Sequence, residues 1–116
     1  MKIINKTNNN VLADNVTVAK TPLKRMKGLL GKREFPKGEA LILDPCNSIH
    51  MLFMNFAIDV LFVDKNNRVV KAVSSIKPFC LTSIYFRSKF AIELPAGTIE
   101  ASHTAAGDEI LLQGRS

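Results

Sequence analysis

The sequence predicts a small, mainly β (α+β) domain, an antiparallel, barrel-like fold with one or two short helices. Its 116 residues fit a single domain, 1–116. The contents of hydrophobic (47%) and charged (22%) residues are those of an ordinary globular protein, which argues against disorder. Short runs rich in β-branched and aromatic residues alternate with turn-forming residues, and this pattern is typical of small antiparallel sheets.

The first third of the chain is predicted to contain β-structure followed by a helix. Residues 2–5 form a strand, and residues 11–19 form either one bulged strand or two short strands, because Asp14 and Asn15 interrupt the β-branched residues. Thr21 is a suitable helix N-cap, and Pro22 suits the first helical position. Helical spacing then predicts an apolar face packed on the sheet, with Gly31 as the end of the helix; this face comprises Leu23, Met26, Leu29 and Leu30.

The rest of the chain is predicted to be mostly strands. Residues 64–67 suit a hairpin turn, residues 74–87 include a loop at Lys77-Pro78, and Thr98 suits the N-cap of a short helix over 98–104. The expected strands are 40–43, 49–54, 58–63, 68–73, 90–94 and 109–112.

Positive charge is concentrated between residues 20 and 37. Seven basic residues lie there against Glu34 alone; the expected basic surface comprises Lys20, Lys24, Arg25, Lys27, Lys32 and Arg33. Such a segment could bind an acidic protein or an anionic ligand. Nucleic acid is a weak alternative because only Phe35 is nearby for base stacking. A solvated helix face with a basic loop explains the segment more simply, so the partner remains unknown.

The sequence predicts a cytoplasmic protein. No apolar run reaches the roughly 18 residues that a membrane span needs. The first ten residues, MKIINKTNNN, are too polar for the apolar core of a signal peptide. Cys46 and Cys80 are then expected to be reduced thiols.

Six blocks of the sequence resemble those of a known prokaryotic family. In order, they are Met26-x-Gly28-Leu29-Leu30-Gly31, Cys46-Asn47-Ser48-Ile49-His50, Phe53-Met54, Ile58-Asp59-Val60-Leu61-Phe62-Val63-Asp64, Glu93-Leu94-Pro95-Ala96-Gly97 and Gly107-Asp108. Together they resemble the widespread bacterial and archaeal family called domain of unknown function 192. The resemblance implies a compact, mainly β single domain, and it brings no established activity, substrate, cofactor or catalytic residue. Asn55 and Ala57 stand where other relatives often have Arg and Pro.

The block around Cys46 and His50 contains reactive side chains but no complete catalytic motif. The two residues are four apart, so on one strand they would lie roughly 13 Å from each other, too far for a thiol–imidazole pair. Cys46 is better explained as a small, partly buried hydrophobic residue. A zinc site would need closer Cys or His pairs than Cys46, His50, Cys80 and His103 provide. We therefore expect no metal and no cofactor.

Two acidic residues lie within apolar strands. Asp59 could orient His50 or contact a ligand, but an Asp at a strand start that binds loop amides, such as those of the 55–57 turn, is the favoured interpretation. Glu93 has the same two interpretations. The predicted pocket lies near the 46–54 motif and comprises Ser48, His50, Asp59 and Glu93.

Two classes of function stay open, and the sequence does not decide whether the protein is an enzyme. The preferred one is a small, non-catalytic binding or interaction domain that uses this pocket and the basic helix face. The alternative is a small hydrolase or transferase with His50 as general base, assisted by Ser48 or Asp59.

Overall fold

Two sheets and two short helices make up the part of the chain that the computed structural model describes, residues 1–29, 31–51 and 54–114. The smaller sheet has the strand order β2-β1-β8 and the larger one the order β3-β4-β7-β5-β6. The strands are β1 (Lys2–Asn5), β2 (Asn10–Ala13), β3 (Asn15–Ala19), β4 (Glu39–Leu43), β5 (Ile58–Val63), β6 (Val69–Ile76), β7 (Phe90–Pro95) and β8 (Ile110–Gln113). The helices are α1 (Pro22–Lys27) and α2 (Thr98–Ala101).

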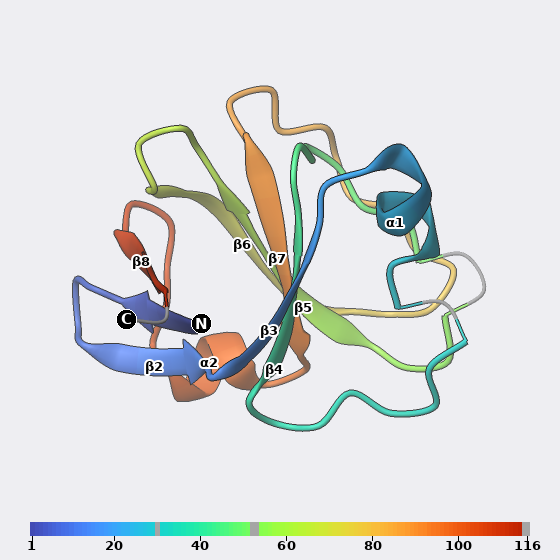
Figure 1. The fold of residues 1–116 in the computed structure, drawn as a ribbon, viewed down its shortest axis with the longest axis horizontal. Coiled ribbons are helices and arrows are strands. Elements are labelled where there is room, and N and C mark those ends of the chain that lie inside the picture. Colours follow the sequence, from blue (N-terminus) through green and yellow to red (C-terminus); the bar gives the residue numbers. More distant parts are fainter. Residues whose placement is uncertain (30, 52–53, 115–116) are drawn as a thin grey trace.

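The mainly β, single-domain prediction is confirmed, but the barrel-like closure is wrong. The larger sheet is open and ends at β3 and β6 within the described residues. The chain leaves the small sheet after β2, and β3 then pairs in parallel with β4 instead of continuing beside β1. The other strand pairs are antiparallel. This change of sheet at Asp14 produces two stacked sheets rather than a closed one (Figure 1).

The larger sheet is buried on both faces and separates two apolar cores. Along β5, Leu61 and Val63 pack toward the small sheet and α2, whereas Val60 and Phe62 pack toward the side of α1. Side chains alternate between the faces because the period of a strand is two residues. In Figure 1 the small sheet and α2 lie to the left of the larger sheet, and α1 lies to the right. The central strands therefore hold side chains for two separate environments.

Helix α1 is shorter and rotated relative to the prediction. It is capped by Thr21, whose Oγ1 accepts from the backbone N–H of Lys24, and it ends at Lys27 because Gly28 has φ +43°. Leu29 is buried as expected, but Leu23 is 76% exposed. Among the described side chains of this short helix, Arg25 is half-buried and the others are exposed. The side chain of Met26, like Leu30, lies outside the described residues.

A strand was predicted over 49–54, but the described residues 49–51 belong to a loop that pairs with a second loop. The N–H of Met51 donates to Cys80 (2.8 Å), the N–H of Thr82 to Ile49 (2.9 Å), and the N–H of Tyr85 to Asn47 (2.8 Å), each at the carbonyl oxygen. Of this ladder only His50 and Leu81 form a bridge, so no regular strand develops. Residues 52 and 53 lie outside the described residues.

The second helix also differs from the prediction. Gly97, not Thr98, occupies the N-cap position, and α2 ends at Ala101. Gly97 has φ +96°, a conformation that glycine adopts without steric cost. The first turn of α2 therefore starts from a left-handed glycine and has no hydrogen bond from a side-chain cap.

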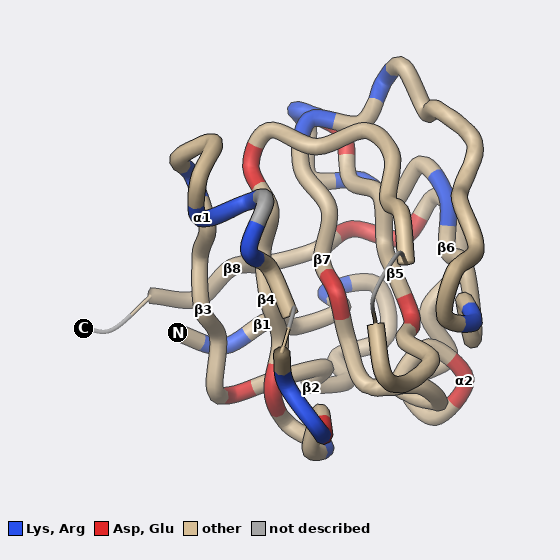
Figure 2. Tube along the Cα trace, turned by 90° about the vertical axis from the view of Figure 1, so that its right-hand side faces the viewer, with Lys and Arg blue, Asp and Glu red and all other residues tan. Residues whose placement is uncertain are grey.

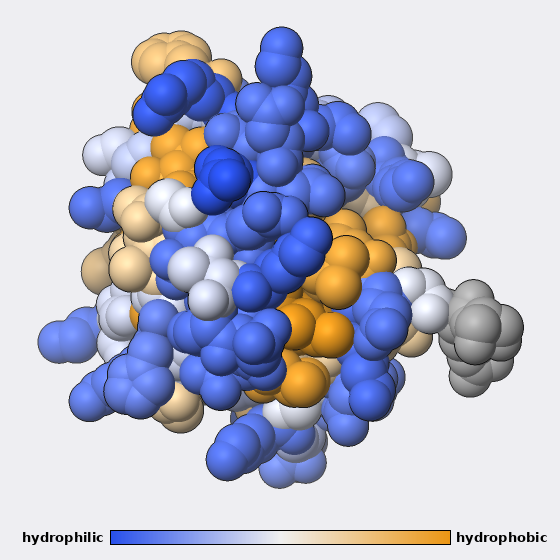
Figure 3. Space-filling view, turned by 90° about the vertical axis from the view of Figure 1, so that its left-hand side faces the viewer, coloured by the Kyte–Doolittle hydropathy of each residue, from blue (hydrophilic) through white to orange (hydrophobic). Residues whose placement is uncertain are grey.

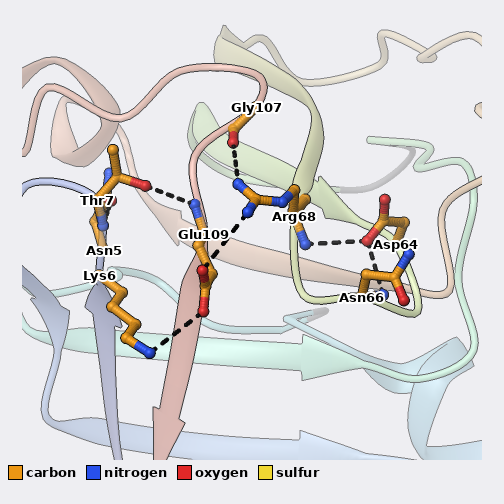
Figure 4. Close-up of polar contacts among 8 residues, drawn as sticks. All are labelled: Asn5, Lys6, Thr7, Asp64, Asn66, Arg68, Gly107 and Glu109. Atoms are coloured by element: carbon orange, nitrogen blue, oxygen red, sulfur yellow. Dashed lines mark hydrogen bonds and ion pairs between the residues drawn. The ribbon is translucent and has the colours of Figure 1, made fainter.

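A polar strip joins the small sheet to the β5–β6 hairpin (Figure 4). Glu109 lies 3.6 Å from Lys6 Nζ and 3.8 Å from Arg68 Nη2, and its backbone N–H donates to Thr7 Oγ1. Arg68 Nη1 also donates to the Gly107 carbonyl oxygen at 3.1 Å. These ion pairs are exposed, so each contributes little to the stability of the fold.

The face of the molecule away from α1 is mostly hydrophilic. Figure 3 shows this face with hydrophobic areas, the larger one right of centre, between polar and charged side chains. A large cavity lies on the opposite side, beside α1.

Candidate functional site

A cavity of about 360 Å³ lies between α1, the loop after β4 and strand β7. Its size is within the range of small-ligand sites. The residues that line it are Pro22, Arg25, Lys27, Gly28, Leu29, Leu43, Cys46, Ser48, Ile49, His50, Met54 and Glu93. The cavity therefore combines apolar walls with a small number of charged and polar groups.

Glu93 is the buried acid of this cavity. It lies in β7, where its neighbours across the sheet are Leu41 of β4 and Val60 of β5. Its side chain is on the α1 side of the sheet and only 6% exposed. Among the described residues no donor makes a hydrogen bond to its carboxyl group. Burial raises the pKa of Glu93 to about 7, because the charged form loses its hydration without gaining a partner.

Two cations of α1 lie around the cavity. Arg25 is half-buried and donates from Nη1 to the Pro45 carbonyl oxygen at 3.0 Å, which ties the helix to the loop after β4. Its Nε is buried and has no hydrogen-bond partner in the described part of the chain. Lys27 lines the same cavity from an exposed position. The cations outnumber the single carboxyl group, so the cavity favours neutral or anionic ligands.

Cys46 is a protonated thiol rather than an activated nucleophile. Its Sγ donates to the Ser48 carbonyl oxygen at 3.2 Å. Burial raises the pKa of Cys46, the backbone of Ser48 lowers it, and the nearby charges of Glu93 and Arg25 raise and lower it, respectively. The net effect is a raised pKa, which reduces the thiolate available at neutral pH.

Ser48 and His50 line the cavity together with Glu93, as the sequence predicts, but Asp59 does not belong to this group. Asp59 shares its face of β5 with Leu61, on the side of the small sheet and α2. It accepts hydrogen bonds from the backbone N–H groups of Ser75 (2.8 Å), Gly97 (3.1 Å) and Ile99 (2.9 Å). The favoured interpretation, an Asp that binds backbone amides, was right in kind, although the amides belong to β6 and α2 and not to the 55–57 turn.

The bulge of β6 explains why Asp59 is needed. Between the pairs Ile58–Ile76 and Val60–Val73 the register shifts by one residue. Ser75, which has φ +51°, is the residue whose N–H is left free by this bulge. Strand alternation places Asp59 opposite it and away from His50. The sequence could not indicate this because the bulge has no glycine or proline signal.

The expected basic surface is divided by the fold. Lys20, Lys24 and Lys27 are exposed, and basic residues are concentrated along α1 (Figure 2). Arg25 instead reaches the cavity. The outer pair Lys32 and Arg33 is exposed too, but Lys32 Nζ lies 3.0 Å from Glu39 Oε1. The sequence pattern placed Arg25 on the solvated surface, and its contact with the cavity was missed. That prediction assumed a longer helix, in which a different set of side chains would be exposed.

Neither a metal centre nor a membrane-spanning helix is found in the described residues. No group of three or more His, Cys, Asp or Glu side chains is arranged to hold a metal ion within ranges 1–29, 31–51 and 54–114. In the same part of the chain, no helix is both long and apolar enough to cross a membrane.

Comparison with known proteins identifies relatives over nearly the whole chain. The family model DUF192, described as "Uncharacterized ACR", matches residues 3–112. A UPF0127 protein of Pyrococcus horikoshii is 34% identical over 113 residues, which cover 93% of this chain and 96% of that protein. A UPF0127 protein of Thermococcus sibiricus is 34% identical over 112 residues, covering 93% of this chain and 72% of the relative.

A solved structure shares the fold. The crystal structure of a protein of unknown function from Novosphingobium aromaticivorans superposes with a TM-score of 0.82 at 18% identity. The superposition covers 96% of this chain and 82% of that one. Together with the family match over residues 3–112, this means that the chain belongs to the DUF192 family, whose function is uncharacterised.

Proposed function

We propose that this protein is a non-catalytic binding domain whose cavity beside α1 takes a small ligand with an apolar body and an anionic head. The observation that carries the proposal is the carboxyl group of Glu93, which is buried at the cavity without a hydrogen-bond donor among the described residues. The carboxyl oxygens are not fully enclosed by protein, so they are open to a hydrogen-bond partner from the cavity. A ligand that enters the cavity can supply the missing partner.

Charge selects the head of the ligand. Below its pKa of about 7, Glu93 carries a proton and can donate a hydrogen bond to an anionic oxygen. Arg25 and Lys27 add positive charge around the same cavity. A carboxylate or another singly charged oxyanion therefore meets one neutral donor and two cations, whereas an amine meets two like charges.

Shape and hydropathy select the body of the ligand. Apolar side chains of the cavity come from different segments of the chain: Leu29, Leu43, Ile49 and Met54. Burial of an aliphatic chain against them contributes about 0.8 kcal/mol per CH2 group. A short aliphatic chain of a few carbons fits a cavity of about 360 Å³.

The geometry favours binding over catalysis. Cys46 has a raised pKa, which disfavours the thiolate that nucleophilic attack requires. His50 lacks the Asp59 assistant on which the hydrolase or transferase alternative relied, because that carboxylate binds three backbone N–H groups elsewhere. A cytoplasmic setting is part of the proposal, since free Cys46 and Cys80 suit a reducing compartment.

A homologous series of ligands tests the proposal. Butyrate, hexanoate and octanoate, with the matching amines as comparison, are titrated into the 15N-labelled protein. The carboxylates are expected to shift the amide resonances of residues 46–49 and 92–94, and affinity should rise with chain length. Above the Glu93 pKa the affinity should fall by up to about ten-fold for each pH unit, the limit set by the linkage of one proton.

Glu93→Gln and Glu100→Gln form the matched pair of variants. Glu93→Gln keeps an uncharged side chain that can donate, so its binding should no longer depend on pH. Glu100 is an exposed acid of α2, and its replacement should leave the titration unchanged. Amide shifts that are spread evenly over the molecule, or amines that bind as tightly as carboxylates, would overturn the proposal.

A further inference from the structure

Four large apolar side chains project into solvent from one loop, residues 77–88. Phe79 is 65% exposed, Leu81 71%, Ile84 54% and Phe86 84%. Isolated exposed apolar residues are common on protein surfaces, but a group within one short loop is not. Such a group usually marks a surface that is covered by something else.

Hydrogen bonds and packing hold the loop in place, so the exposure of its apolar side chains belongs to a defined loop conformation. Its backbone is hydrogen-bonded to residues 47–51, and Ser88 Oγ donates to the Cys46 carbonyl oxygen at 2.9 Å. The Tyr85 ring packs on Phe62, with 4.7 Å between centroids. The half-buried Tyr85 thus anchors the loop between its exposed Ile84 and Phe86.

The backbone conformation of Phe79 is a second indication that the loop structure keeps its apolar side chains exposed. It adopts φ +67°, the left-handed region that a bulky residue rarely occupies. Its N–H donates to the Met51 carbonyl oxygen at 2.7 Å, which holds this conformation. Strain of this kind persists where the surrounding structure enforces it, and it often accompanies a binding role.

The surroundings of the apolar side chains are basic. Lys77 and Arg87 are exposed near the two ends of the loop, and the loop contains no acidic residue. The longer stretch 65–92 has six basic residues and no acidic one. The basic segment at 20–37 is therefore not the only one in the chain. Charge complementarity selects an anionic partner for this loop.

From these features we infer that residues 77–88 dock onto an anionic lipid surface. The four exposed side chains do not line the cavities beside α1, beside α2 or between β3 and β8. A protruding loop suits a deformable surface into which each side chain can insert separately. Apolar residues then enter the boundary between headgroups and acyl chains, while Lys77 and Arg87 contact anionic headgroups.

Vesicle co-sedimentation of the full chain tests the inference. Vesicles of phosphatidylcholine with phosphatidylglycerol are compared with vesicles of phosphatidylcholine alone, at low and at physiological salt. The protein is expected to pellet with the anionic vesicles, and salt should weaken this binding. Absence of pelleting with anionic vesicles, or equal pelleting with neutral ones, would overturn the inference.

Two pairs of variants separate the apolar and the charged contributions. Leu81→Ser/Phe86→Ser should weaken vesicle binding by about ten-fold or more for each side chain, whereas Val11→Ser, at an exposed apolar site of β2, should not. Lys77→Gln/Arg87→Gln should weaken it by about five-fold for each charge, and Lys2→Gln/Lys37→Gln by less. All these positions are exposed, so thermal unfolding should stay the same. Unchanged vesicle binding in both loop variants would contradict lipid docking and leave the loop to an acidic protein partner.

Discussion

The two faces of the central strand pair β5–β7 each bury a carboxyl group, and the two groups differ in their hydrogen bonding. Asp59, on the face toward α2, accepts three backbone hydrogen bonds. Glu93, one residue away in register on the face toward α1, receives none from the described residues and borders a cavity. Both strands are fully buried, so burial alone does not distinguish the two acids.

The difference lies in what the neighbouring elements offer. A β-bulge at Ser75 and the start of α2 leave N–H groups that the Asp59 carboxylate satisfies, and Asp59 is therefore part of the architecture. Around Glu93 lies a cavity lined by both apolar and polar side chains, and none of the described residues donates a hydrogen bond to its carboxyl group. A buried acid without donors has a raised pKa and unused hydrogen-bonding capacity, which is typical of functional sites.

The largest effect is expected from Asp59→Asn. The substitution keeps the volume but turns one acceptor oxygen into a donor that faces backbone N–H groups, so the free energy of unfolding should fall by about 4 kcal/mol. Urea denaturation followed by circular dichroism measures this. Asp14→Asn, at an exposed position, is the control and should stay within about 0.5 kcal/mol of the unchanged protein. A small loss for Asp59→Asn would mean that the two acids are equivalent.

Glu93→Gln should raise the free energy of unfolding at neutral and alkaline pH, opposite to the effect of Asp59→Asn. The unfolded chain loses the Glu93 proton near the ordinary glutamate pKa of 4.5, whereas the folded protein holds it until the raised pKa of about 7. Stability from this group is thus fully present below 4.5 and declines as pH rises to about 7. Above that pH the variant, which has no charge to bury, should be more stable than the unchanged protein by about 3 kcal/mol.

The pH dependence of denaturation provides the test for Glu93. The two unfolding free energies should converge in acid and separate between pH 4.5 and about 7. Glu100→Gln should follow the unchanged protein at every pH because its side chain is exposed. Parallel curves for Glu93→Gln and the unchanged protein would show that the carboxyl group is not desolvated.

The smallest effect concerns the thiol beside the cavity. Cys46 should react with iodoacetamide more slowly than the exposed Cys80, because burial raises the Cys46 pKa. In Glu93→Gln the rate at Cys46 should rise, since the negative charge that also raises this pKa is removed. Peptide mass spectrometry over time separates the two sites. If Cys46 reacts first, its thiolate is stabilised and a catalytic role has to be reconsidered.

Local patterns were enough to predict most strands and the start of α1. The predicted range 58–63 matches β5, because a short apolar run bounded by turn residues is typical of a buried strand. The range 49–54 failed for a physical reason: its backbone partners lie about 30 residues away in a loop that itself has no strand pattern. The prediction of a closed sheet failed for a similar reason: the change of sheet at Asp14 depends on which distant strand pairs with β3.

Prediction of the candidate site shows the same limit. Ser48, His50 and Glu93 were placed together because their blocks are dense in polar residues within apolar sequence. Asp59 was grouped with them because the parity of two antiparallel strands cannot be known without their register. Arg25 was assigned to the surface, since its approach to the cavity depends on the early end of α1 at Gly28.

Residues 46–50 serve two neighbours at once. On one side Cys46, Ser48 and Ile49 line the cavity, and on the other Asn47 and Ile49 accept hydrogen bonds from the 77–88 loop. A displacement of this single segment changes both the cavity and the exposed loop. If the cavity and the loop bind as proposed, any coupling free energy between the two sites must be reciprocal. Any factor by which an anionic ligand alters the affinity for vesicles is the factor by which vesicles alter the affinity for that ligand.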